Sequence, residues 1–89
     1  MSTTDQWTVR LSIIELDGQT NAEARLVMGD DNHLSGRGKA RRNPDDPNVT
    51  RIGEEIAVAR ALADLAHHVL AAAAAGIESV THERAQLHL

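Results

Sequence analysis

The sequence contains no cysteine and, apart from Trp7, no aromatic residue among its 89 positions. Without cysteine the chain forms no disulfide and holds no thiolate-ligated zinc ion. Because Phe and Tyr are absent, its core has to be built from Ile, Leu, Val and Ala. Proteins that bind single-stranded nucleic acid usually stack its bases on aromatic side chains, and this composition offers no such platform.

The sequence also shows no segment that would direct the protein to secretion or into a membrane. The start, "MSTTDQWTV", lacks the basic residues and apolar run of a secretory signal, and no apolar stretch reaches the roughly 18–20 residues that span a bilayer. We therefore expect a cytoplasmic protein without a membrane partner. A chain of this length forms one domain, residues 1–89, with a small core that favours dimerisation. Residues 1–5 are expected to be a flexible N-terminus.

Hydrophobic periodicity predicts three strands, at residues 7–16, 20–28 and 34–42, because apolar and polar side chains alternate there. Asp17-Gly18 is a hairpin signal between the first two, and residues 29–32 form a second turn. Short turns join consecutive strands into an antiparallel meander. In the first strand Trp7, Val9, Leu11 and Ile13 share the face that is expected to meet the core.

A helix of about residues 50–75 follows a loop at residues 43–48 that contains two prolines and two aspartates. Thr50 is the expected N-cap and Gly76 the expected stop. The predicted apolar rows of this helix are Ile52, Ile56, Ala59, Ala63, Ala66 and Leu70, and Val58, Leu62, Leu65 and Val69. Residues 77–89 form a C-terminal arm or a short helix. The fold class is therefore α+β, a three-stranded antiparallel β-meander packed by one long α-helix.

The third strand carries a basic cluster in a chain whose formal net charge is −4. Alternation places Gly36, Gly38 and Ala40 on one face and Arg37, Lys39 and Arg41 on the other. Small residues let a helix approach closely, so the cationic side chains are expected to point outward. By the same alternation, Arg10 of the first strand and Arg25 of the second strand are expected on this outward face. Most acidic residues fall in the turns, the loop and the helix.

Guanidinium groups pair with phosphate oxygens, so this face is a candidate site for nucleic acid. Two other interpretations stay open: a solvated sheet in which Arg10 or Arg25 pairs with Glu23 across strands, and a surface for an acidic protein. The predicted RNA- or partner-binding residues are Arg10, Arg25, Arg37, Lys39 and Arg41 on the face, with Arg42 and Arg51 at its rim.

Motifs for catalysis or metal binding are incomplete. "GRGKAR" has Arg41 where a dinucleotide fingerprint needs its third glycine, and "HERAQ" has Gln86 where a zinc protease needs its second histidine. Asp64 and His68 lie one helical turn apart but have no third ligand at a recognisable spacing, so an ion pair is the simpler interpretation. We predict no catalytic residue, cofactor, metal or small-molecule substrate.

Five segments in order resemble a family of small actinobacterial proteins with dormancy-associated, hypoxia-induced members: "WTVRLSI", "AEARL", "GRGKARRNPDDPNV", "IGEEIAVARALADL" and "IESVTH". The resemblance implies a fold like the double-stranded-RNA-binding domain without its first helix. It also implies a homodimer shaped like ribosome hibernation promoting factors, with the ribosome or its RNA as partner and repressed translation as the outcome. Where those RNA-binding domains begin the last helix with lysines, this chain has "RIGEE", so the sheet face has to provide the contact.

Overall fold

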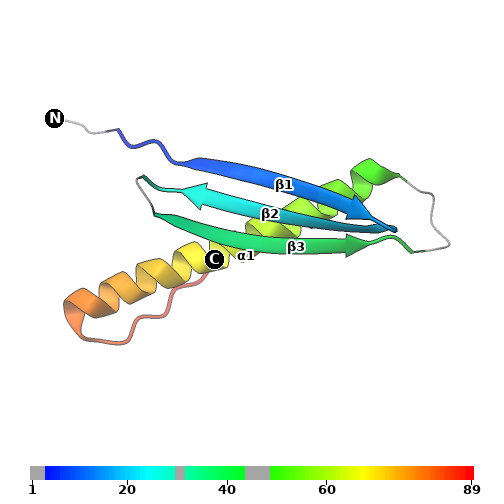
Figure 1. Cartoon of the computed structure of the whole chain (residues 1–89). Helices are drawn as coiled ribbons and strands as arrows, with labels where there is room; N and C mark the ends of the chain where they lie inside the picture. Colours follow the sequence, from blue (N-terminus) through cyan, green and yellow to red (C-terminus); the bar gives the residue numbers. More distant parts are fainter. Residues whose placement is uncertain (1–3, 30–31, 44–48) are drawn as a thin grey trace.

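The computed structural model describes residues 4–29, 32–43 and 49–89 of the chain. Three antiparallel strands, β1 (Thr8–Leu16), β2 (Gln19–Val27) and β3 (His33–Arg41), form a sheet in the order β1-β2-β3. One helix, α1 (Thr50–Thr81), crosses one face of it (Figure 1). The predicted α+β meander is confirmed. Parts of the predicted N-terminus, second turn and loop lie outside the described residues.

The first hairpin has the tight turn that its sequence predicts. Leu16 pairs with Gln19, which leaves a loop of Asp17 and Gly18 alone. Both residues have positive φ, 52° for Asp17 and 75° for Gly18. A two-residue turn of this kind matches the right-handed twist of the flanking strands, and Asp-Gly suits it because glycine adopts a positive φ without a steric cost.

The register of the sheet confirms the predicted parity of the third strand. Gly36 lies opposite Ala24 and Gly38 opposite Ala22, and these small residues face the helix. A Cβ atom at Gly38 would collide with the backbone of Ala57 and Ala61, and one at Gly36 would collide with Ala61 and Leu65. Backbone therefore packs on backbone at this contact, and glycine is required at both positions.

The buried row of the helix differs from the predicted rows. Ala57, Ala61 and Leu65, spaced four residues apart, are the buried positions of α1. Ile52 and Leu62, which we predicted to be in the core, are 55% and 41% exposed. Leu65 of the predicted rows is buried, and Val58 and Val69 are partly buried against the core. For Ile52 and Leu62 the prediction was wrong because it followed hydrophobicity alone. A strand face made of glycine selects the smallest side chains of the helix as its counterpart.

The helix packs mainly on β3 and β2 and makes few contacts with the edge strand β1. Its apolar row on the helix side, Val9, Leu11 and Ile13, is consequently 39–47% exposed. Trp7, which we expected on the core side, precedes the strand and is 56% exposed. The alternation of β1 is real, but one helix is too narrow to bury three strands.

The predicted start of the helix at residue 50 is confirmed, whereas the predicted N-cap is wrong by one residue and the predicted end by six. Val49, with an extended backbone, is the N-cap in place of Thr50, and its side chain makes no capping hydrogen bond. The helix continues through Gly76 to Thr81 and ends at His82, whose φ is 60°. The tail then folds back along the helix, where the amide of Ala85 donates to Glu78 Oε1 at 2.8 Å (Figure 1). Gly76 did not act as a stop because a left-handed C-cap formed six residues later.

By length and composition alone, α1 is apolar enough to cross a membrane. The signal is weak, since a helix that packs on the sheet of a globular domain passes the same test. In this structure Ala57, Ala61 and Leu65 of α1 are buried against the sheet.

Side chains of α1 cover the outer edge of β3. Arg60 Nη1 donates to the carbonyl oxygen of Lys39 at 2.7 Å, and the amide of Arg37 donates to Asp64 Oδ2 at 2.9 Å. His68 Nδ1 lies 2.6 Å from the carbonyl oxygen of Ser35, its acceptor. Four residues along the helix advance about 6 Å, and two residues along the strand advance about 6.8 Å. Because these lengths are similar, every fourth residue of α1 can contact every second residue of β3. Backbone groups that an edge strand leaves unpaired are thereby satisfied.

Removing the central contact of this edge should destabilise the fold modestly. We expect Asp64→Leu to lower the free energy of unfolding by about 1 kcal/mol, the usual value of a partly exposed hydrogen bond. Asp64→Asn keeps an acceptor oxygen and is the matched control, with a loss near half that size. Urea titration of both variants measures the difference. Equal stabilities for the leucine and asparagine variants would contradict a role for this acceptor.

Candidate nucleic-acid interface

The face of the sheet turned away from α1 carries five cationic side chains. The register places Arg10 opposite Arg25, and Lys39 opposite Asn21, all with the parity opposite to the buried alanines. Arg37 and Arg41 share the parity of Lys39. Glu23 is the acidic side chain of this face within the described strands. This basic face consists of Arg10, Arg25, Arg37, Lys39 and Arg41, and all five predicted positions lie together on it.

Arg10 and Arg25 face each other directly across β1 and β2. Like charges opposite each other in a sheet repel, and an anion placed between them removes that repulsion. They line a shallow hollow of about 480 Å³ together with Ser12, Glu23 and His33. Hydroxyl, imidazole and guanidinium groups all bind phosphate oxygens, so the hollow has suitable donors for a backbone phosphate.

Glu23 pairs with Arg37 rather than with Arg10 or Arg25. Arg37 Nε lies 3.3 Å from Glu23 Oε2, and the two residues are opposite each other in the register. The Arg37 side chain is 81% exposed, and an ion pair in such a setting contributes at most about 1 kcal/mol. A cross-strand ion pair is therefore present, but it involves Arg37 and not Arg10 or Arg25, which we considered as the partners of Glu23. Four other cations share the face.

The structure does not bring Arg42 and Arg51 onto the basic face. Arg42 follows β3, where its amide donates to the carbonyl oxygen of Gly18 at 2.9 Å. By alternation its side chain lies on the helix side of the sheet. Arg51 lies in the first turn of α1, on the same side. A rim contribution from these two residues stays a prediction.

His33 and Asn32 are lining residues that the sequence reasoning missed. The predicted third strand began at Leu34, whereas β3 begins at His33. Extending the predicted strand by one residue places His33 on the same face as Ser35 and Arg37, so the alternation in the sequence could have identified it.

Within the described parts of the chain, no group of three His, Asp or Glu residues is arranged to hold a metal ion. The predicted contact between Asp64 and His68 is present, with His68 Nε2 at 3.7 Å from Asp64 Oδ1. The other ring nitrogen of His68 is used by the edge of β3. This pair therefore has a structural role in the covered edge.

Comparison with known proteins assigns the chain to a family. Residues 5–86 match the family described as Rv2632c-like. The chain belongs to the Rv2632c-like family. It is 49% identical over 81 residues to "Uncharacterized protein Mb1767" of Mycobacterium bovis, which covers 91% of this chain and 85% of that protein. It is 44% identical over 71 residues to "Uncharacterized protein Rv2632c" of Mycobacterium tuberculosis, or 80% of this chain and 75% of that protein.

A solved structure shows the same architecture. The crystal structure of Rv2632c superposes with a TM-score of 0.82 at 38% sequence identity, over 92% of this chain and 96% of that one. The predicted resemblance to an actinobacterial family is thereby confirmed, as is the sheet with one long helix across it. This Rv2632c-like chain shares its fold and most of its length with these mycobacterial relatives.

Proposed function

We propose that this Rv2632c-like protein is a non-enzymatic, cytoplasmic stress or dormancy protein that binds ribosomal RNA and represses translation. The observation that carries the proposal is the basic face, where Arg10 and Arg25 stand opposite each other beside three further cations. A chain with net charge −4 gathers these cations on one surface. Fields from such a patch act within about 8–10 Å at ordinary salt, so the acidic remainder does not cancel them.

The mode of binding follows from what the face carries. It has guanidinium, ammonium, hydroxyl and imidazole groups and, among the described residues, no Phe, Tyr or Trp side chain. Such groups contact phosphates and sugars, whereas stacking on aromatic rings holds unpaired bases. We therefore propose contact with the backbone of folded RNA, with recognition of its shape more than of its sequence.

Co-sedimentation with ribosomes over a salt series tests the proposal. Five phosphate contacts give a slope of log K against log salt concentration on the order of −3 to −5. An acidic protein partner is the competing interpretation of the same face. In that case an excess of ribosomal RNA does not displace the partner, and the protein stays in the supernatant at every salt concentration.

We further propose that the protein acts as a homodimer that joins through β1. The edge of β3 is covered by Arg60, Asp64 and His68, whereas α1 packs mainly on β2 and β3 and, among the described residues, makes no such side-chain hydrogen bond to β1. The same strand exposes the apolar row Val9, Leu11 and Ile13. A free edge beside an exposed apolar row is a template for pairing with another strand.

A second copy fits this edge because β1 is self-complementary in antiparallel pairing. If Leu11 meets Leu11 of the second copy, Val9 falls opposite Ile13 of the second copy. Arg10 then lies opposite Ser12 of the second copy, which avoids a further arginine pair. The result is a six-stranded sheet whose two basic faces are continuous, an isologous arrangement around a twofold axis.

Replacing Leu11 by lysine should make the protein monomeric. The charge would be buried between the two apolar rows of the dimer, which costs several kcal/mol. Light scattering after gel filtration should give twice the chain mass for the wild type and the single chain mass for Leu11→Lys. Ser12→Gln, on the opposite side of the same strand, is the control and should remain dimeric, because it adds a long polar side chain without placing a cation opposite Arg10 of the second copy. A monomeric wild type at micromolar concentration would rule out this assembly.

A further inference from the structure

The basic face has two parts, a concave end and a stripe along one strand. The concave end is the hollow of about 480 Å³ near the end of β2 and the start of β3, and its polar lining residues are Arg10, Ser12, Glu23, Arg25, Asn32 and His33. We call it the basic hollow. The cations that do not line it form the β3 stripe, which consists of Arg37, Lys39 and Arg41. The space is many times the roughly 30 Å³ that a water molecule takes up in the liquid, so it admits a whole phosphate group.

Side chains from three strands border the basic hollow. Arg10 and Arg25 are direct partners in the register of β1 and β2. Directly opposite residues have Cβ atoms about 4.5–5.5 Å apart, so both guanidinium groups can reach one anion. Ser35 is the partner of Arg25 on β3, which places His33 at the diagonal position, still within reach of a long side chain.

The acidic residue of the basic hollow has a partner on the β3 stripe. Glu23 Oε2 lies 3.3 Å from Arg37 Nε. In the described strands and helix, neither Arg10 nor Arg25 forms an ion pair with a carboxylate. These two arginines therefore keep their charges for an anion from outside, and binding one relieves the repulsion between them.

A terminal phosphate matches this set of donors better than an internal phosphate does. A phosphomonoester carries a charge of about −1.5 to −2 at pH 7 and three acceptor oxygens. An internal phosphate of a nucleic acid carries a single charge, and two of its oxygens continue the chain. Two guanidinium groups, an imidazole N–H and the Ser12 hydroxyl supply donors for all three oxygens of the terminal group.

The β3 stripe indicates what the terminal phosphate is attached to. Its three cations occupy alternate positions of β3, so they are about 6.8 Å apart and lead away from the basic hollow toward the other end of the sheet. Evenly spaced cations in a row suit the successive phosphates of a nucleic acid strand. A free nucleotide would leave most of them without a contact.

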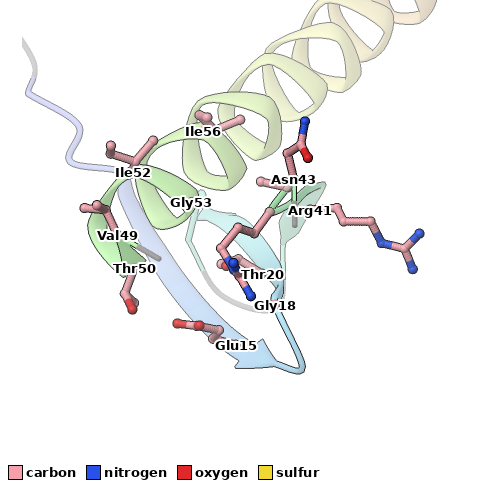
Figure 2. Close-up of a pocket in the computed structure, with 12 residues that line it drawn as sticks. Glu15, Gly18, Thr20, Arg41, Asn43, Val49, Thr50, Ile52, Gly53 and Ile56 are labelled. Carbon is pink, nitrogen blue, oxygen red and sulfur yellow. The ribbon is translucent and has the colours of Figure 1, made fainter. Parts of the chain in front are cut away.

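A further hollow, of about 260 Å³ at the start of α1, has different chemistry (Figure 2). Arg41 and Arg42 border it, but so do Ile52, Ile56 and the acidic Glu15. Apolar walls and a carboxylate both disfavour a phosphate dianion. This hollow shares no lining residue with the basic hollow, so binding at the two places can be distinguished.

We propose that the basic hollow binds the terminal phosphate of an RNA strand whose following phosphates lie on the β3 stripe. Arg10 and Arg25 neutralise the dianion, and His33 and Ser12 donate further hydrogen bonds to it. This inference rests on the proposed function, because it takes RNA as the ligand, and it adds that the end of a strand is recognised.

Fluorescence anisotropy with one short RNA hairpin tests the inference. The hairpin is prepared with a 5′-phosphate, with a 3′-phosphate, or with hydroxyl groups at both ends. We expect at least one phosphorylated form to bind about tenfold more tightly than the hydroxyl form, the effect of added hydrogen bonds between charged groups. Equal affinities of all three forms would overturn the inference and leave the proposed function intact, whereas no binding of any form would overturn both. Tighter binding of a phosphoserine peptide than of the phosphorylated hairpin would also overturn the inference.

Two arginine variants locate the preference on the surface. Arg25→Gln should reduce it from about tenfold to less than about twofold, because one of the two guanidinium groups of the basic hollow is lost. Arg41→Gln, the same change at the far end of the β3 stripe, should weaken all forms of the hairpin alike and keep the preference. Both side chains are exposed, so neither change should disturb the fold. An unchanged preference in Arg25→Gln, or NMR shifts at Thr20 and Gly53 of the hollow in Figure 2 in place of shifts at Arg10 and His33, would contradict this site.

Discussion

Gly38→Ala should lower the free energy of unfolding by about 3 kcal/mol or more, although it adds a single methyl group. The added Cβ would collide with the Ala57 carbonyl and the Ala61 amide, which are backbone atoms held by the helix and cannot rotate away. Overpacking of an ordinary core costs about 1–3 kcal/mol, and a backbone collision belongs at or above the top of that range. A domain of this size has a total stability of roughly 4–13 kcal/mol, so such a loss is severe. Circular dichroism during a urea titration measures it.

Gly76→Ala is the matched control in the same chain. Gly76 lies inside α1, and no atom approaches within 4 Å of the position of its missing Cβ. Alanine there should raise the free energy of unfolding by about 1 kcal/mol, because alanine favours the helix over glycine by that amount. The same substitution, glycine to alanine, should therefore lower the free energy of unfolding at position 38 and raise it at position 76. A stable Gly38→Ala variant would mean that the helix does not lie on β3 in this way.

Arg10→Glu/Lys39→Glu should abolish binding to ribosomes at 0.1 M salt without unfolding the protein. Glutamate at position 10 faces Arg25 and forms a cross-strand ion pair there, and position 39 faces Asn21, so both changes are tolerated by the sheet. Two lost phosphate contacts should lower affinity by about 100-fold and make the salt slope shallower by about 2. Unchanged co-sedimentation of this folded variant would exclude the basic face as the binding surface.

Local chemistry was enough to predict most of the fold. Alternation identified all three strands, and the Asp17-Gly18 pair identified the hairpin, because each feature depends on neighbours in the sequence. Side chains alternate between the two faces of a strand, so the sequence alone predicted that Gly36 and Gly38 lie on the face opposite to Lys39. The five residues of the basic face follow from the same rule.

Features that depend on tertiary distance were not predictable in this way. The sequence of β1 has the same alternation whether or not a helix covers it, so the exposure of Leu11 became visible only in the structure. The choice of Ala57 and Ala61 over Ile52 and Leu62 depends on the glycines of a strand that is distant in sequence. Similarly, the side chain of Thr20 packs against Gly53, which lies 33 positions further along the chain.

The salt dependence of binding to one ribosomal RNA duplex is the most direct test of the central claim that cations on the open sheet face contact phosphate. Lys39→Glu lies on that face, whereas Arg84→Glu, with the same charge change, lies in the tail beyond α1. We predict a slope of about −3 to −5 for the wild type and for Arg84→Glu, and a slope shallower by about 1 for Lys39→Glu. Equal slopes for the two variants would contradict the account, because binding would then follow net charge rather than this face.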